Sequence, residues 1–246
     1  MFKYTALTTM TLLALTACGG GGGSGQQDSR NGGNEPAATP LVGAWIAQGT
    51  YLSGESSTTA IAIMPDGRVY GYEDTGNLII GTISPTATTI DQNFRVHDAY
   101  DGTYAHSIRL QMSQQLGSLY QGTTWYGNEQ LADFSAVPYG NTPADNGLLA
   151  GNWLTSSETG SYVISSSGQV SGYDQYSECE LAGQVSAIAG TDLYEINVRP
   201  SGCYLSEDNG NYRGGGFLWA NVENYRAFIG VIANDQRAFP IELIRQ

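Results

Sequence analysis

The sequence predicts an all-β protein with two tandem antiparallel β-barrel-like domains of about eight strands each, which follow a disordered tether. Three observations support this fold class. Glycine and tyrosine are frequent, with 33 and 16 residues among 246, and this composition is typical of strands joined by tight turns. The apolar residues alternate with a period of two and show no sustained helical period. Finally, the second half of the chain repeats the first.

The repeat is visible as segments that match in the same order. The pairs are 41–45 with 149–153, 67–73 with 168–174, 80–84 with 182–186 and, more weakly, 120–122 with 212–214. Ordered matches at a nearly constant offset indicate an internal duplication. We therefore expect one barrel-like repeat over 41–138, a turn-rich linker over 139–147 and a second repeat over 148–246.

Hairpins are the clearest local elements inside each repeat. The strand pairs are 60–64 with 68–72, 162–165 with 169–173, and 227–232 with 237–244. Each pair flanks a short turn that contains glycine, asparagine or aspartate, which is the usual chemistry of a β-hairpin. Closure of such hairpins into a barrel would leave no exposed strand edge.

The first 17 residues read as a signal peptide with Lys3 at its charged start. The apolar run over 6–15 is too short for a transmembrane helix, which needs about 20 residues. The quartet Leu15-Thr16-Ala17-Cys18 resembles the lipobox of bacterial lipoproteins, which implies cleavage before Cys18 and acylation of that cysteine. A plain secretory signal with an incidental cysteine is the alternative, and the polyglycine segment that follows argues against it.

Residues 18–40 are expected to hold the lipidated cysteine and a flexible tether. They contain almost no large apolar side chain and cannot bury enough surface to fold. The lipobox and polyglycine together resemble the N-termini of surface-exposed lipoproteins of Gram-negative pathogens. In enteric lipoproteins an aspartate after the cysteine causes retention in the inner membrane. Gly19 at that position favours the outer membrane, where the acyl chains would anchor the protein.

Charge restricts the possible partners. The formal net charge is −13, and it becomes −14 when Lys3, the only lysine, leaves with the signal peptide. An acidic surface without lysine argues against nucleic-acid binding, which relies on basic patches. It also excludes a lysine nucleophile. Attraction of a cationic protein partner stays open.

One of the three cysteines is assigned to lipidation, and the other two are left to pair with each other. If Cys18 carries the lipid, Cys179 and Cys203 remain in an oxidising compartment. We expect them to form a disulfide. No histidine occurs in the second repeat, so a catalytic or metal-binding pair is the weaker interpretation.

Histidines and carboxylates offer little sign of catalysis or metal binding. His97 and His106 lie near Asp91, Asp98 and Asp101, but their odd spacing and the turn signal Asp-Gly favour a hairpin loop over a metal site. We expect neither a metal nor another cofactor.

Paired carboxylates can hydrolyse glycosides when they are held at a suitable separation. Asp66 and Asp74 in the first repeat, and Glu178 and Glu180 in the second, are more simply surface and turn residues. No Gly-x-Ser-x-Gly nucleophile elbow occurs. We therefore do not expect an enzyme.

A Gly-x-Trp in the first strand, followed by hairpins and a late Tyr-x-Gly, resembles the small barrels of the calycin type, the lipocalins and avidins. The resemblance implies that Trp45 and Trp153 each close one end of a barrel. Loop tips are expected to carry Tyr100, Tyr104 and Tyr176. Tyrosine supplies rigid contact area, so these three are candidate contact residues.

The expected function is that of a non-enzymatic binding or interaction module anchored to the outer membrane, on a face that the sequence does not reveal. One alternative is a calycin-like carrier of a small apolar ligand, which requires a barrel cavity of a few hundred cubic ångströms. Another is an inhibitor of a cationic host or envelope enzyme, such as lysozyme or a protease, which would bind in a salt-sensitive way.

Overall fold

The computed structural model describes residues 41–115, 118–140, 142–220 and 226–246. The predicted signal peptide, Cys18 and the predicted tether lie outside the described residues. Within the described ranges, no helix has the length and apolar character needed to cross a membrane.

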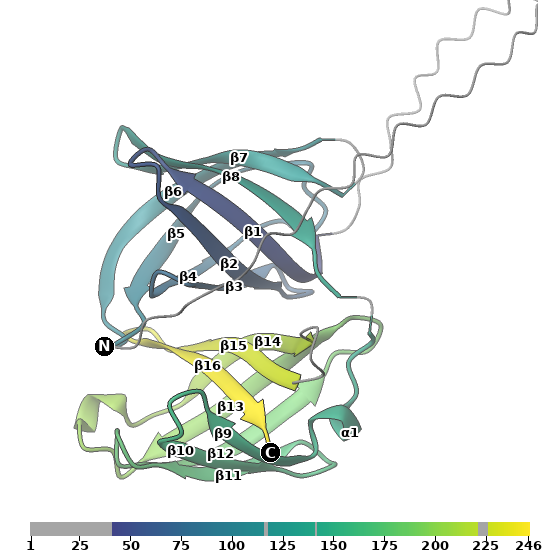
Figure 1. The fold of residues 1–246 in the computed structure, drawn as a ribbon, viewed down its shortest axis with the longest axis vertical. Helices are drawn as coiled ribbons and strands as arrows, with labels where there is room; N and C mark the ends of the chain where they lie inside the picture. Colours follow the sequence, from purple (N-terminus) through teal and green to yellow (C-terminus); the bar gives the residue numbers. More distant parts are fainter. Residues whose placement is uncertain (1–40, 116–117, 141, 221–225) are drawn as a thin grey trace, which may run out of the picture. The chain divides into compact units, whose positions relative to one another are not determined.

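The first repeat forms a closed antiparallel barrel (Figure 1). Its strands are β1 (Gly43–Tyr51), β2 (Ser56–Ile63), β3 (Arg68–Glu73), β4 (Asn77–Thr82), β5 (Thr89–Asp98), β6 (Tyr104–Gln114), β7 (Tyr120–Tyr126) and β8 (Glu129–Pro138). Each strand pairs with the next, and β1 pairs with β8 to close the barrel. This order is the simplest for consecutive hairpins.

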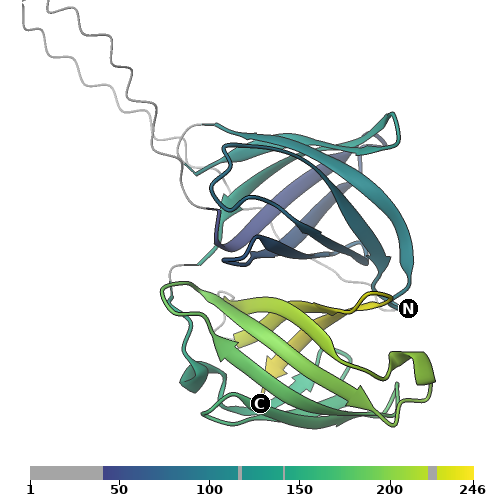
Figure 2. The ribbon, with the colours of Figure 1, turned by 180° about the vertical axis from the view of Figure 1, so that it is seen from behind.

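The second repeat forms another closed antiparallel barrel, which Figure 2 shows from behind. Its strands are β9 (Gly151–Thr155), β10 (Gly160–Ile164), β11 (Gln169–Asp174), β12 (Cys179–Ala187), β13 (Leu193–Ser201), β14 (Tyr212–Ala220), β15 (Arg226–Ala233) and β16 (Ala238–Arg245). A short helix α1 (Asn146–Leu149) precedes β9, and a 3₁₀ turn, Ser206–Asp208, precedes β14.

The predicted fold class is confirmed, because both repeats are eight-stranded antiparallel barrels. The three predicted hairpins correspond to β2–β3, β10–β11 and β15–β16. Successive side chains of a strand point to opposite faces, so every second residue faces the barrel interior. On β3 the residues at this spacing are Val69, Gly71 and Glu73, which line the interior of the first barrel.

Each barrel has its own apolar core, and a third buried cluster contains outward-facing residues of both barrels. Tyr70 of β3 and Phe217 of β14 belong to this third cluster. Arg68 Nη2 donates a hydrogen bond to Glu195 Oε1 at 2.9 Å at its edge. The outer faces of β2, β3, β14 and β15 are therefore partly buried, rather than being uniformly polar.

Candidate functional site

The interior of the second barrel is not filled by side chains. It contains a cavity of about 580 Å³, within the range of small-molecule sites. Eight strands make a barrel wide enough to hold one small ligand. The apolar and aromatic residues of its lining include Tyr162, Ile164, Val170, Leu181, Val185, Ile196, Val198, Phe228, Ile232, Phe239, Ile241 and Leu243.

The predicted barrel-end tryptophans occupy equivalent places. Trp153 is buried, and its indole N–H donates to the carbonyl of Leu149 at 2.7 Å. Trp45 is also buried and donates in the same way to Leu41, four residues earlier, at 2.7 Å. The shared geometry is consistent with the duplication. That each tryptophan closes one end of a barrel stays a prediction.

Two of the three candidate contact tyrosines meet at the mouth of this cavity. Tyr100, from the turn between β5 and β6, is 82% exposed, and Tyr176, from the turn between β11 and β12, is 69% exposed. Their hydroxyl oxygens lie 2.9 Å apart. Tyr104 lies elsewhere: its ring contacts the ring of His97, and its hydroxyl lies 3.1 Å from Ser107 Oγ.

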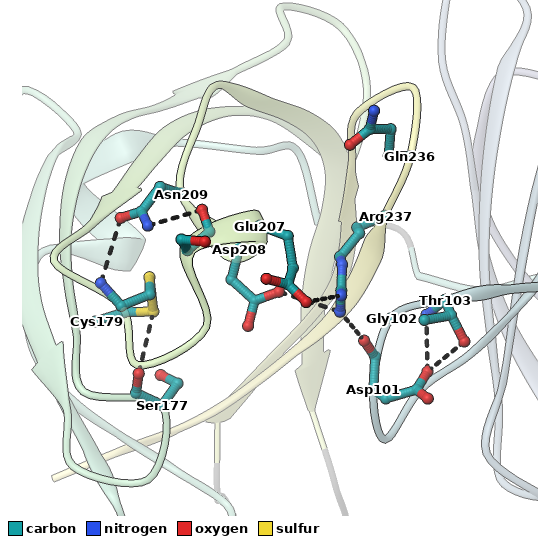
Figure 3. A network of polar contacts seen from close by, with 12 residues as sticks. Asp101, Gly102, Thr103, Ser177, Cys179, Glu207, Asp208, Asn209, Gln236 and Arg237 are labelled. Carbon is teal, nitrogen blue, oxygen red and sulfur yellow. Dashed lines mark hydrogen bonds and ion pairs between the residues drawn. A yellow bond between two sulfur atoms is a disulfide. The ribbon is translucent and has the colours of Figure 1, made fainter.

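Arg237 is the centre of a polar network at the same mouth (Figure 3). Its Nη1 donates to the backbone carbonyl of Asp101 at 2.6 Å, and its Nη2 donates to Glu207 Oε1 at 3.0 Å. Asp208 Oδ1 faces Nη1 at 3.2 Å. The Asp101 carboxylate accepts hydrogen bonds from Thr103 and so holds the β5–β6 turn in shape. Arg237 therefore links this turn to the 3₁₀ segment.

The predicted disulfide is confirmed, and it lies beside the mouth. It joins Cys179, at the start of β12, to Cys203, across a sequence separation of 24 residues. The backbone N–H of Cys203 donates to Asn209 Oδ1 at 3.3 Å. The bond thereby restrains the two loops that carry Tyr176 and Tyr204 at the rim.

The described charged residues that line this cavity are all acidic. Its described lining residues include no lysine, arginine or histidine, and the acidic members are Asp101, Asp174, Asp208 and Glu242. Burial, with a smaller contribution from the Asp174 carboxylate, raises the pKa of Tyr162 above its usual value. Tyr162 therefore stays neutral, and the cavity combines an apolar wall with acidic groups.

His97 and His106, which the sequence favoured as residues of a hairpin loop over metal ligands, lie instead in β5 and β6, the two strands that flank the Asp-Gly turn. His97 is buried, with Nδ1 3.1 Å from the carbonyl oxygen of Gly102. His106 instead lines a second cavity, of about 330 Å³, inside the first barrel. Asp91 forms an ion pair with Arg109 at 2.6 Å. Among the residues with described positions, no group of three or more histidines, cysteines and carboxylates is arranged to hold a metal.

Several site residues were not singled out from the sequence. Arg237 was one of nine arginines without a distinguishing motif, and Glu73 was overlooked beside Asp74. The usable signal for Glu73 was its register: in β3 it lies two residues beyond Gly71, at an inward position. An acidic residue at such a position is unusual enough to mark a site.

Comparison with known proteins finds no matching family model, no matching curated protein and no matching solved structure.

Proposed function

We propose that this protein is a non-enzymatic binding protein that holds a small, uncharged, apolar molecule inside its second barrel. One observation carries the proposal: the barrel encloses about 580 Å³ with a largely aliphatic and aromatic wall. Burial of an apolar ligand there gains roughly 25 cal/mol per Å² of surface removed from water. A preformed cavity also lowers the ordering cost of binding.

The rim favours an uncharged ligand over an anionic one. Asp101, Asp174 and Asp208 line the cavity, while Arg237 already contacts Asp101, Glu207 and Asp208. A ligand carboxylate would be repelled by the aspartates and would find no unengaged cation among the described lining residues. A fatty alcohol is therefore expected to bind more tightly than the fatty acid of the same length.

The proposed location comes from the sequence. Acylation of Cys18 would anchor the protein to the outer membrane, and the segment up to residue 40 would serve as its tether. This arrangement suits a carrier that receives or releases apolar molecules close to a lipid surface, where such molecules concentrate. The membrane is accordingly the first proposed partner.

The first prediction uses a substitution that fills the second cavity. Leu181→Trp adds a bulky ring to a half-buried lining position, so affinity for the uncharged probe pyrene should fall at least about tenfold, or ~1.4 kcal/mol. Leu110→Trp, which enters the cavity of the first barrel, is the matched control and should have little effect. Fluorescence titration measures both, and equal losses in the two variants would contradict the assignment to the second barrel.

A second candidate function is binding of a cationic protein, such as a host or envelope lysozyme. The net charge of −14 after signal-peptide removal supports it, as do the exposed tyrosines Tyr100 and Tyr176 beside acidic groups. Electrostatic binding of this kind weakens steeply with salt. Lysozyme inhibition that is absent, or unaffected between low and high salt, would eliminate this candidate.

A further inference from the structure

The cavity of the first barrel differs in chemistry from that of the second. It has a volume of about 330 Å³, and much of its wall is apolar, with Ile61, Ile79, Leu110 and Phe134 among the lining residues. These side chains are only partly buried although they belong to the barrel core, because they face the open space. A single ring or a short alkyl chain fits such a volume.

The same cavity also reaches a buried carboxylate. Glu73, the last residue of β3, is only 6% exposed. Its Oε1 accepts a hydrogen bond from the Tyr51 hydroxyl at 2.8 Å, and its Oε2 accepts from Thr75 Oγ1 and Asn77 Nδ2, both at 2.6 Å. Tyr51, Asn77 and Glu73 all line the cavity. The carboxylate is therefore held by neutral donors at a polar end of the cavity.

These donors keep Glu73 ionised. Burial alone raises the pKa of the carboxyl, but hydrogen bonds from Asn77, Thr75, Ser57 and Tyr51 outweigh it and leave the pKa below its usual value. Burial and the bond to Glu73 raise the pKa of Tyr51 to about 12, so the phenol stays a donor. A negative charge thus persists in a largely apolar enclosure at neutral pH.

No cation of the described chain neutralises this charge. The ion pairs of the described residues involve Arg68, Arg109, Arg213 and Arg237, and none includes Glu73. Besides Glu73 and Tyr51, the ionisable side chain among the described residues that line this cavity is His106. A buried charge without a counter-charge is costly, and a cation delivered by a ligand would compensate it.

We propose that the first barrel is a second, separate binding site for a small organic amine, with the ligand ammonium at Glu73 and its apolar body against the aliphatic and aromatic wall. Charge-assisted hydrogen bonds to a carboxylate are the strong ones in proteins. The ammonium would approach the charge that the four neutral donors hold in place. Selectivity for a cation would come from Glu73, while the wall would select the size of the apolar part.

The test compares one amine with its uncharged analogue on the full chain. At pH 8 a primary alkylamine is protonated, as a lysine side chain is, and isothermal calorimetry with 2-phenylethylamine and 2-phenylethanol then reports the contribution of the ligand's charge. The wild-type protein is expected to prefer the amine by about tenfold or more. Glu73→Gln should remove this preference and leave binding of the alcohol within about twofold.

The matched control is Asp174→Asn, at the position that corresponds to Glu73 in the second repeat. It should leave the preference for the amine intact. Glu73→Gln should leave pyrene binding in the second barrel unchanged. Failure of the amine proposal for the first barrel can therefore be distinguished from failure of the proposed function of the second barrel. If Glu73→Gln does not fold, Leu110→Trp must abolish amine binding without altering the carboxylate network.

A purely structural role of Glu73 predicts a different pattern. Glu73→Gln would then lower the melting temperature, while amine and alcohol would bind equally well, or not at all, to the wild-type protein. Either result would overturn the proposal. An unchanged preference for the amine in a folded Glu73→Gln variant would overturn it as well.

Discussion

At the scale of single residues, the face of a strand on which a side chain lies determines its chemistry. Glu73 and Asp74 are adjacent acids at the end of β3. Asp74 is exposed and accepts a hydrogen bond from the backbone N–H of Thr58 at 3.0 Å, as suits a turn residue. Glu73 points inward and is buried. A shift of one residue along the strand thus changes a carboxylate exposed to solvent, Asp74, into a charged group inside a cavity, Glu73.

His97 provides a prediction at the same scale. It is 1% exposed. Burial lowers its pKa, which the hydrogen bond with the Gly102 carbonyl only partly opposes and the Arg95 charge lowers further. The unfolded chain therefore binds more protons than the folded protein as the pH falls through about 6.5. The free energy of unfolding should decrease between pH 7 and pH 5.

His97→Asn tests this expectation, because the asparagine amide retains a donor for the Gly102 carbonyl. Urea unfolding at pH 7, 6 and 5 should show a shallower loss of stability in this variant than in the wild-type protein. His106→Asn, at a half-exposed cavity position, is measured in parallel to separate the contribution of His97 from that of the chain's other histidine. Identical slopes for wild type and His97→Asn would show that His97 does not contribute.

At the scale of elements, the loops at the mouth are held by a disulfide, by polar side-chain links and by an isolated β-bridge between Thr103 and Arg237. The disulfide between Cys179 and Cys203 restrains the loops of Tyr176 and Tyr204. Arg237 links the 3₁₀ segment to the β5–β6 turn. Rigid strands thus carry the cavity wall, while linked loops form its rim, as is common in binding proteins.

Removal of the disulfide should lower the stability of the protein and weaken ligand binding in the second barrel only. For a closed loop with a separation of 24 residues, the double substitution Cys179→Ser and Cys203→Ser should lower the free energy of unfolding by about 3 kcal/mol. Pyrene affinity in the second barrel should fall because the rim loops lose their restraint. Amine binding in the first barrel is the internal control. Unchanged stability and pyrene affinity would contradict the role assigned to the bond.

At the scale of the whole molecule, the buried cluster shared by the two barrels couples them. Phe217 is 2% exposed in this cluster and lies 5.5 Å from the ring of Tyr139. The stacked rings of Tyr139 and Trp219, 4.6 Å apart, continue the packing. Separation of the barrels would expose this apolar surface to water. We therefore expect the folded part to unfold in one calorimetric transition.

Phe217→Asp should divide that transition. The substitution places an unpaired charge in the shared cluster. It should lower the free energy of unfolding by roughly 3 to 5 kcal/mol, as other unpaired buried charges do. Two separate heat-capacity peaks are expected, one for each barrel. Val163→Asp, on the exposed face of β10, is the matched control and should preserve a single peak. A single peak in both variants would mean that the barrels do not depend on this cluster.

By itself, the sequence determined the fold class, the duplication, the three hairpins and the pairing of Cys179 with Cys203. These features follow from local physics: side chains alternate along a strand, turns need particular residues, and two cysteines remain after the first is assigned to lipid. Because alternate residues of a strand share a face, the sequence pattern of β3 could have predicted that Glu73 points into the barrel.

Only the tertiary structure decided what lies inside and between the barrels. The volume left empty depends on how side chains from eight strands pack together, and no strand encodes it alone. Tyr100 and Tyr176 meet although 76 residues separate them. Tyr70 packs in the shared cluster, and Glu73 finds neutral donors without a cation. Such outcomes depend on long-range contacts, which determine where a cavity remains and which charge faces it.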